Sequence, residues 1–260
     1  MNQSFDEQPF PPPSQPQRIA VQLPASAPRV TYTILGVTIF FYLLQMASDL
    51  FLRPSPYGIN YVEFLGAKIN SAIRAGELWR LLTPALLHGS IMHIGFNMYA
   101  LLSFGTGLER RFGHGRFLAL YVLSAFSGNV LSFLFTSGIS LGASTAIFGL
   151  IAAEGIFLFQ NRKLFGNETQ RAIGNIIFVV AINLFLGLSP GIDNWGHIGG
   201  LLGGAIFAWF AGPLWAVEGI YPALHLVDHR EFRDVMVGAS MVVIIFGALT
   251  IWGMMYPLVK

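Results

Sequence analysis

Residues 117–153 read FLALYVLSAFSGNVLSFLFTSGISLGASTAIFGLIAA and contain no Asp, Glu, Lys or Arg. A helix needs about 20 apolar residues to cross the hydrocarbon core of a bilayer, so this stretch is too long for one crossing. The segment Ser137-Gly138-Ile139-Ser140 in its middle consists largely of turn-forming residues. The stretch therefore predicts two membrane helices that are joined by a turn.

The composition of the whole chain also indicates a membrane protein. Hydrophobic residues make up 54% of the 260 residues and charged residues only 11%, whereas soluble domains carry about a quarter charged residues. The mean hydropathy is +0.60. The net charge of +2 argues against a nucleic-acid partner, and the absence of cysteine excludes disulfides, thiolate metal sites and a cysteine nucleophile. We expect an all-α, polytopic bundle of membrane helices in contact with the lipid bilayer.

Other long stretches without charged residues extend this pattern. They are Val30–Ser48, Leu81–Leu108, Ala172–Ile192, Asn194–Val217 and Val235–Val259. Together they predict seven membrane helices, which start near residues 31, 92, 116, 143, 172, 196 and 235. The fourth helix continues to about Gln160 and contains Glu154, the one charged residue within any of them.

The chain divides into three parts. Residues 1–29 hold seven of the 14 prolines and no sustained apolar run, which predicts a disordered Pro-rich cytoplasmic tail. Residues 30–216 form a six-helix core whose long first loop, residues 50–90, is expected to be ordered at the membrane surface. Residues 217–260 form a connector and the seventh helix, residues 235–258. We expect the connector Val217–Asp234 to be solvated, with an amphipathic interfacial helix as the alternative.

The distribution of Lys and Arg predicts the orientation of the chain in the membrane. Most of the 15 basic residues fall on the cytoplasmic side if the N-terminus is cytoplasmic, and the C-terminus then lies outside. The first 29 residues lack both the apolar core of a secretory signal and the Arg-rich, acid-poor composition of a transit peptide. We therefore expect a bacterial plasma membrane.

Polar residues concentrate at the start of three of the expected helices. His93 and Asn97 lie on the second helix, Ser144 on the fourth and His197 on the sixth. Even-numbered helices run in the same direction, so these residues share one depth near the outer face. Polar groups within the membrane are unfavourable and often functional. A serine, a histidine and two further hydrogen-bonding side chains are the groups that nucleophilic acyl transfer requires.

The residue types suggest a role for each group. Ser144 is the candidate nucleophile, and Gly142 lets the backbone turn tightly into the helix that starts there. Free backbone N–H groups in that first turn can bind an oxyanion. His197 is the candidate general base. His93 and Asn97 are four residues apart on one helical face and can donate hydrogen bonds to developing negative charge.

Small residues predict that the fourth and sixth helices pack closely. Gly196, Gly200 and Gly204 recur at every fourth position on the sixth helix. Thr145, Gly149 and Ala153 have the same spacing on the fourth. Small residues at this spacing let two membrane helices approach each other closely. Close approach would bring the hydroxyl of the fourth helix within reach of the imidazole of the sixth.

Five sequence elements in residues 31–216 resemble the rhomboid family of intramembrane serine proteases. Three of them resemble the family's nucleophile motif, the motif of its catalytic histidine and the element that supports its oxyanion hole. The other two resemble the Trp-Arg pair of its first loop and the segment that closes its second helix. In that order they are Gly142-Ala143-Ser144; Gly196-His197-Ile198-Gly199-Gly200 with Gly204; His93-Ile94-Gly95-Phe96-Asn97; Trp79-Arg80; and Gly107-Leu108-Glu109 with Gly113. The seventh helix lies outside the family's shared core and resembles its six-plus-one arrangement.

The resemblance implies a Ser–His dyad that requires no acid, no metal and no cofactor. Its implied substrates are single-pass membrane proteins, which are cleaved within or near their transmembrane segments. A catalytically weak or silent rhomboid-like protein that binds transmembrane clients is the alternative. One departure bears on this choice, because Thr145 stands where the family motif usually has glycine.

Several other polar residues have simpler interpretations. Arg80 is expected to hold the first loop and Glu109 to cap backbone at the end of the second helix. His88 is expected to be a structural hydrogen-bonding residue of the loop. Asp193 is a weak candidate for orienting His197. Glu154 lies too far from Ser144 to join the dyad, so we expect a buried hydrogen-bonding group facing Asn183 or water, with a proton relay as the alternative.

Overall fold

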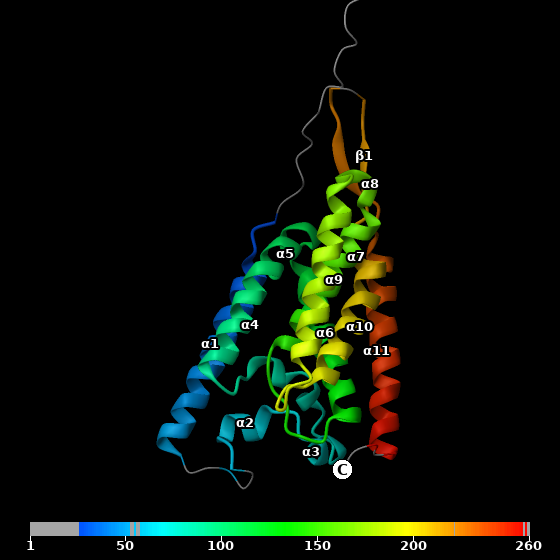
Figure 1. Ribbon diagram of the computed structural model, residues 1–260. Coiled ribbons are helices and arrows are strands. Elements are labelled where there is room, and N and C mark those ends of the chain that lie inside the picture. Colours follow the sequence, from blue (N-terminus) through cyan, green and yellow to red (C-terminus); the bar gives the residue numbers. More distant parts are fainter. Residues whose placement is uncertain (1–25, 53–54, 56–57, 221, 257, 259–260) are drawn as a thin grey trace, which may run out of the picture.

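The computed structural model describes residues 26–52, 55, 58–220, 222–256 and 258. Residues 1–25, which include nearly all of the expected disordered tail, lie outside the described residues. The described part is mostly helical and forms an elongated bundle (Figure 1). The expectation of an all-α membrane bundle is therefore confirmed.

A helix is present in every stretch where the sequence predicts one. In chain order these are α1 (Arg29–Phe51), α4 (Ile91–Ala100) with α5 (Thr106–Phe112), α6 (His114–Phe135), α7 (Ser144–Gln160), α9 (Glu168–Leu186), α10 (Asn194–Ala211) and α11 (Phe232–Met255). A π-helical turn, η3 (Leu101–Gly105), joins α4 to α5, and α8 (Arg162–Phe165) follows α7. Among the described residues, α1, α6, α9 and α11 are long and apolar enough to cross a membrane, and α7 is a shorter apolar helix. The number of spans stays a prediction.

The helix α10 lies at the centre of the bundle, where it packs against α6, α7 and α11. Its glycines make this possible. A Cβ added at Gly200 would overlap the carbonyl oxygen of Thr145 on α7, and one at Gly204 would overlap Gly149. On the side facing α6, a Cβ added at Gly199 would lie 2.9 Å from the Cα of Gly128. The predicted close packing of the fourth and sixth helices is confirmed, and it extends to α6.

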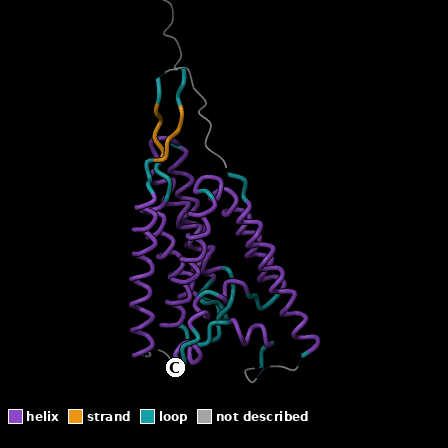
Figure 2. The backbone as a smooth tube through the Cα atoms, turned by 180° about the vertical axis from the view of Figure 1, so that it is seen from behind, coloured by secondary structure: helices purple, strands orange, loops and turns teal. Residues whose placement is uncertain are grey.

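The helices alternate in direction, so that α4, α7 and α10 all start at the same end of the bundle (Figure 1). The first loop lies at this end as well, whereas the β-hairpin lies at the opposite end (Figure 2). The peripheral helices are largely exposed. In the most apolar 18-residue stretch of α9 only 6% of the residues are buried, compared with 72% in that of α6. Helix α9 is therefore the least buried of α1, α6, α9 and α11.

The first loop contains short helices rather than irregular backbone. They are α2 (Tyr61–Gly66), α3 (Asn70–Arg74) and the 3₁₀ turns η1 (Leu78–Leu81) and η2 (Thr83–Leu86). Asn60 caps α2 by accepting a hydrogen bond from the N–H of Glu63 at 2.8 Å. An antiparallel bridge between Lys68 and Ser140 joins this loop to the segment that precedes α7. The described part of the loop is thus ordered, as the sequence predicts.

The connector before α11 includes two short strands that the sequence did not predict. It contains an antiparallel hairpin of β1 (Trp215–Glu218) and β2 (His225–Asp228), in which Trp215 pairs with Asp228. The alternative prediction of an amphipathic interfacial helix in the connector is therefore wrong. The Asp228 side chain accepts a hydrogen bond from the N–H of Leu214 at 2.9 Å and pairs with Arg116 at 2.5 Å. These long-range contacts fix the hairpin to α6, and local sequence pattern does not reveal them.

Candidate active site

The structure brings Ser144 and His197 together. His197 Nε2 lies 3.0 Å from Ser144 Oγ, although the two residues are 53 positions apart in the sequence. Ser144 is the first residue of α7, and His197 is in the first turn of α10. The close approach of these two helices, which their glycines allow, sets this distance. The pair has the geometry of a nucleophile hydrogen-bonded to a general base.

The backbone before Ser144 has the conformation that the sequence predicts for Gly142. Its φ is +135°, in the region that side chains disfavour. A Cβ at this position would lie 2.7 Å from Nε2 of His93. The Gly142 N–H donates to the carbonyl oxygen of Pro84 at 2.9 Å, which ties the turn to the first loop. Glycine is therefore required here both for backbone conformation and for space beside His93.

Phe148 supports the ring of His197, and sequence reasoning did not identify it. The two rings are stacked, with centroids 4.2 Å apart and an angle of 11° between their planes. Phe148 and His197 are both buried, 5% and 8% exposed. The signal for Phe148 was its position four residues after Ser144, which places both on one face of α7. The stacking restricts the orientation of the imidazole.

Asp193 does not orient His197 through its side chain. Its carboxylate caps α10 by accepting from the N–H of Gly196 at 3.0 Å, and it accepts from Thr136 Oγ1 at 2.8 Å and Ser140 Oγ at 2.5 Å. Burial alone would raise the pKa of Asp193, but these hydrogen bonds outweigh burial and hold the pKa below its usual value. Within the described residues, His197 Nδ1 has no hydrogen-bond partner. Asp193 therefore joins the start of α10 to the loop before Ser144.

His93 and Asn97 differ in their relation to the dyad. The His93 ring lies beside the turn at Gly142, as described above, and packs edge-on against His88 with ring centroids 4.9 Å apart. Asn97 is 7% exposed, and its Nδ2 donates to the carbonyl oxygen of His93 at 3.1 Å. The structure thus brings His93 close to the nucleophile turn, whereas the hydrogen bond given for Asn97 stays within its own helix. The oxyanion role of both residues stays a prediction.

His88 is a buried residue of the first loop. It is 1% exposed, and its Nε2 lies 3.4 Å from the N–H of Ala143, which donates to it. Burial, reinforced by the nearby His93, lowers the pKa of His88 to about 3. His88 is therefore neutral at pH 7 and able to accept this hydrogen bond from the residue before Ser144. Its contact with backbone agrees with the structural role expected for it.

Lys68 is a further residue that sequence reasoning missed. It is fully buried in the first loop, and its Nζ donates to Asn70 Oδ1 at 3.1 Å and to the carbonyl oxygens of Thr136 and Gly138, each at 2.7 Å. Burial lowers the pKa of Lys68 to about 8. Lys68 thus fixes the segment between α6 and α7, which leads directly to Ser144. No local feature of the sequence distinguishes this lysine from an exposed one.

The motif residues of the first loop and of the second helix have structural contacts. Arg80 is 2% exposed and donates to the carbonyl oxygen of Ala67 at 2.8 Å, so it holds the first loop as expected. Trp79 Nε1 donates to the carbonyl oxygen of Leu65 at 3.1 Å. Glu109 accepts from the N–H groups of Val30 at 2.8 Å and Thr31 at 2.7 Å. Glu109 thus caps the start of α1, not the end of the second helix as expected.

The expectation for Glu154 is wrong. Its carboxylate forms a two-pronged ion pair with Arg111, with one contact of 3.0 Å between Arg111 Nη1 and Glu154 Oε1. The Arg111 guanidinium also lies 4.6 Å from the ring centroid of Phe157. Glu154 therefore faces α5 rather than Asn183, because α5 continues the line of α4 in the same direction as α7 and brings Arg111 to the level of Glu154. This ion pair gives Glu154 a structural contact that joins α7 to α5.

Thr145, the departure from the family motif, packs its side chain against α6 and α10. It is 4% exposed, and its methyl group lies 2.9 Å from a Cβ added at Gly128 and 3.1 Å from one added at Gly196. The side chain therefore fills space between α6 and α10. Among the described residues, no three His, Asp or Glu side chains are grouped so that they could hold a metal ion.

Comparisons with known proteins agree with this arrangement. The family model described as Rhomboid domain matches residues 75–214, more than half of the chain. Rhomboid protease GluP of Bacillus subtilis (strain 168) is 45% identical over 180 residues, which cover 68% of this chain and 34% of that protein. From Arabidopsis thaliana, RHOMBOID-like protein 4 is 41% identical over 140 residues and RHOMBOID-like protein 6, mitochondrial, is 40% identical over 166. These alignments cover 54% and 63% of this chain, and 35% and 53% of the two plant proteins. The aligned parts thus span about a third to a half of the relatives' lengths.

The matched family, the apolar helices and the apposed serine and histidine lead to one conclusion. The chain is an integral membrane protein and belongs to the rhomboid family.

Proposed function

We propose that this protein is an intramembrane serine endopeptidase that cleaves transmembrane segments of single-pass membrane proteins. The observation that carries the proposal is the 3.0 Å contact between His197 Nε2 and Ser144 Oγ. The name of a relative that is 45% identical, a rhomboid protease, supports the same activity. The proposal assigns Ser144 as nucleophile and His197 as general base.

In the proposed reaction, His197 Nε2 takes the proton of Ser144 Oγ while this oxygen attacks the scissile carbonyl carbon. The tetrahedral oxyanion forms beside the first turn of α7, whose N–H groups have no preceding helical turn to accept them. His93 adds a donor from the side of Gly142, and Asn97, four residues later on the same helix, is the second proposed donor. His197 then protonates the leaving amine, and a water molecule hydrolyses the acyl-enzyme by the reverse sequence of proton transfers.

The proposed substrates must unwind before they are cleaved. A helical peptide bond has its carbonyl oxygen engaged in a hydrogen bond and its carbonyl carbon shielded by neighbouring turns. A locally unstable transmembrane helix with a small residue at the cut meets this requirement. We propose that substrates enter laterally past α9. Only 6% of the residues in its most apolar stretch are buried, so a displacement of α9 from the bundle disturbs little of the core.

The proposed orientation places the N-terminus in the cytoplasm and the active site toward the extracytoplasmic side of a bacterial plasma membrane. The distribution of Lys and Arg supports it. The first loop, Ser144 and His197 lie at one end of the bundle, and Arg162, Lys163, Arg230 and Arg233 lie at the other end. Water then reaches the dyad from the outer side.

The alternative is a catalytically weak or silent rhomboid-like protein that binds transmembrane clients. The packing of Thr145 between α6 and α10 argues against it, because this residue leaves the path between Ser144 and His197 free. Cleavage of a model single-pass substrate by the reconstituted full chain tests the proposal. We expect cleavage by the unaltered chain and none by Ser144→Ala or His197→Ala; equal cleavage by the unaltered chain and Ser144→Ala would reject the proposal.

A further inference from the structure

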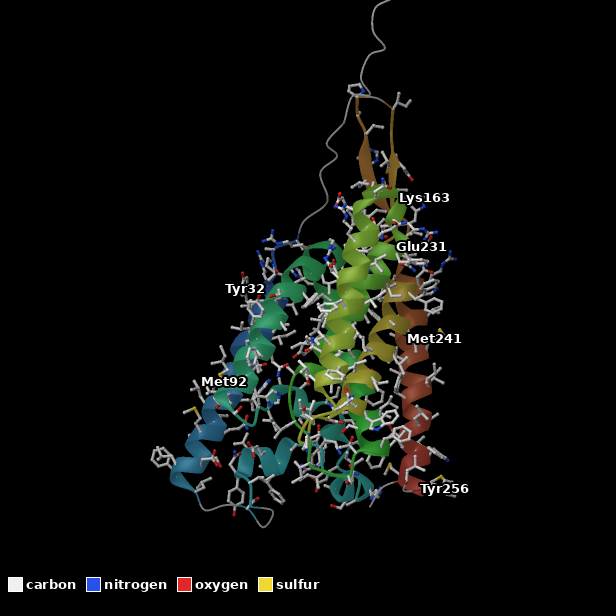
Figure 3. The ribbon with its side chains drawn as sticks, viewed as in Figure 1. Tyr32, Met92, Lys163, Glu231, Met241 and Tyr256 are labelled. Carbon is white, nitrogen blue, oxygen red and sulfur yellow. The ribbon has the colours of Figure 1, made fainter. Side chains whose placement is uncertain are left out.

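A cavity of about 370 Å³ lies at the end of the bundle opposite the dyad, between the end of α7 and the start of β1. Gln160, Arg162, Lys163 and Trp215 are among its lining residues. Figure 3 places Lys163 at the hairpin end of the bundle, far from Tyr256 at the end of α11. The cavity therefore has no part in the dyad chemistry.

The cavity is positively charged and has no counter-ion of its own. Arg162 and Lys163 are exposed, and neither forms an ion pair with any residue that the structure describes. The acidic groups of the neighbouring hairpin are already paired, Asp228 with Arg116 at 2.5 Å and Glu218 with His229 at 3.0 Å. No acidic side chain lines the cavity. This charge favours an anionic ligand.

Two residues that line the cavity each carry a polar atom without a partner. Within the described part of the chain, the indole Nε1–H of Trp215 and the amide oxygen Oε1 of Gln160 are buried and have no hydrogen-bond partner. Gln160 Nε2 donates to the carbonyl oxygen of Trp209 at 2.8 Å, which fixes the amide. Buried polar groups are nearly always paired, so an unpaired donor and an unpaired acceptor beside one cavity indicate a ligand that supplies both partners.

Aromatic side chains place this cavity at the level of lipid headgroups. Phe159 at the end of α7 and Trp209 at the end of α10 stack with ring centroids 6.2 Å apart, and they are 44% and 45% exposed. Aromatic residues of this kind gather at the boundary between membrane and water. The Arg162 guanidinium lies 4.6 Å from the centroid of the Phe159 ring, which holds the cation at the same level.

We propose that this cavity binds the headgroup of an anionic, hydroxyl-bearing phospholipid. Its phosphate oxygens accept hydrogen bonds from Arg162, Lys163 and the Trp215 indole, and a headgroup hydroxyl donates to Gln160 Oε1. Basic pockets at the ends of membrane helices bind phospholipid headgroups in this way. The bound lipid would tie the end of α7 to the hairpin that leads to α11.

The test titrates the purified full chain in an uncharged detergent with dioctanoyl phosphatidylglycerol or dioctanoyl phosphatidylcholine, and native mass spectrometry counts the bound lipid. We expect phosphatidylglycerol to bind at least about tenfold more tightly. The double variant Arg162→Gln/Lys163→Gln should lose about thirtyfold in affinity, because each cation near an anionic headgroup contributes roughly a factor of five. Trp215→Phe, which leaves the charge unchanged, should lose at least about threefold.

The matched control is Arg171→Gln/Arg233→Gln, which removes the same charge at the same end of the bundle but outside the cavity. It should change the affinity by less than about threefold. Three results would overturn the proposal. They are equal binding of the two lipids, an equal loss in the control and the cavity variants, and displacement of phosphatidylglycerol by an equal concentration of inorganic phosphate, which would indicate a free-anion site.

Discussion

Phe148 lies parallel to the imidazole of His197, with ring centroids 4.2 Å apart, and it comes one helical turn after Ser144 on α7. One helix thus carries both the proposed nucleophile and the surface that holds the proposed base. The imidazole has no hydrogen-bond partner at Nδ1 among the described residues, so in the proposed dyad stacking on Phe148 would take the place of the acid in a Ser–His–Asp triad. The geometry of the dyad depends on packing rather than on a third polar group.

Phe148→Ala is therefore expected to reduce the rate of substrate cleavage by at least about tenfold, because the imidazole gains freedom to rotate away from Ser144. Loss of a buried phenylalanine also reduces stability by roughly 3–5 kcal/mol. The control is Phe246→Ala on α11, a residue that is 2% exposed and lies on a different helix from Ser144 and His197. Cleavage rates at a temperature where both variants are folded separate the two effects. Equal losses of activity in the two variants would mean that Phe148 acts through stability alone.

Gly142→Ala is expected to abolish cleavage, with a loss of at least about a hundredfold. The added Cβ would lie 2.7 Å from His93 Nε2, and the backbone would be strained at a φ of +135°. Gly138→Ala in the same loop is the matched control, because a Cβ there meets nothing within 4 Å. We expect Gly138→Ala to cleave at nearly the unaltered rate. Activity retained in Gly142→Ala would show that this turn does not shape the oxyanion site.

Lys68→Met is expected to destabilise the protein by about 3 kcal/mol, since it leaves the carbonyl oxygens of Thr136 and Gly138 buried without their donor. Activity should fall as well, because this segment leads directly to Ser144. Arg171→Met, at an exposed position on α9, should leave both properties unchanged. The measurement is reversible unfolding in mixed micelles together with the cleavage rate. An unaltered unfolding free energy in Lys68→Met would contradict the role assigned to these hydrogen bonds.

His88 predicts a specific dependence of stability on pH. Burial, with a smaller contribution from His93, lowers the pKa of His88 from 6.5 to about 3. The unfolded chain therefore binds a proton below pH 6.5 that the folded chain does not bind until about pH 3. The contribution of this group to stability is complete above pH 6.5 and is lost as the pH falls toward 3, by about 2 kcal/mol between pH 7 and pH 5.

His88→Gln removes this titration and retains a side chain that can accept from the N–H of Ala143. The unfolding free energies of the unaltered chain and of His88→Gln, each measured at pH 7 and pH 5, give the comparison, in which all other titrating groups cancel. We expect the variant to lose about 2 kcal/mol less than the unaltered chain over this interval. The same loss in both proteins would show that His88 keeps an ordinary pKa when folded.

The parts of the fold that the sequence predicts correctly depend on local rules. Long stretches without charge place the helices, because every backbone group in a membrane must be paired within its own segment. The alternation of helix directions then places Ser144 and His197 at one end. The glycines at every fourth position of α10 indicate which helices come into contact. Once the neighbouring helices of α10 are identified, the close spacing between them follows from these glycines.

Most contacts that the sequence did not predict join residues far apart in the chain. Arg111 reaches Glu154 only because α5 and α7 pass at the same level, and a charged residue alone does not reveal its partner. Lys68 has no sequence feature that separates it from an exposed lysine. Asp193 precedes His197 by one helical turn, which suggested an orienting acid, but the cap of α10 and two hydroxyls occupy its carboxylate. Side-chain partners of this kind depend on packing.

Labelling with a fluorophosphonate probe, followed by mass-spectrometric mapping of the adduct, tests the central claim most directly. The probe reacts only with a serine whose proton is removed by a neighbouring base. We predict an adduct on Ser144 in the unaltered chain and none in His197→Ala, while Asp193→Asn retains labelling. An adduct on another residue, or labelling of Ser144 at the same rate in His197→Ala, would contradict the assignment of the dyad.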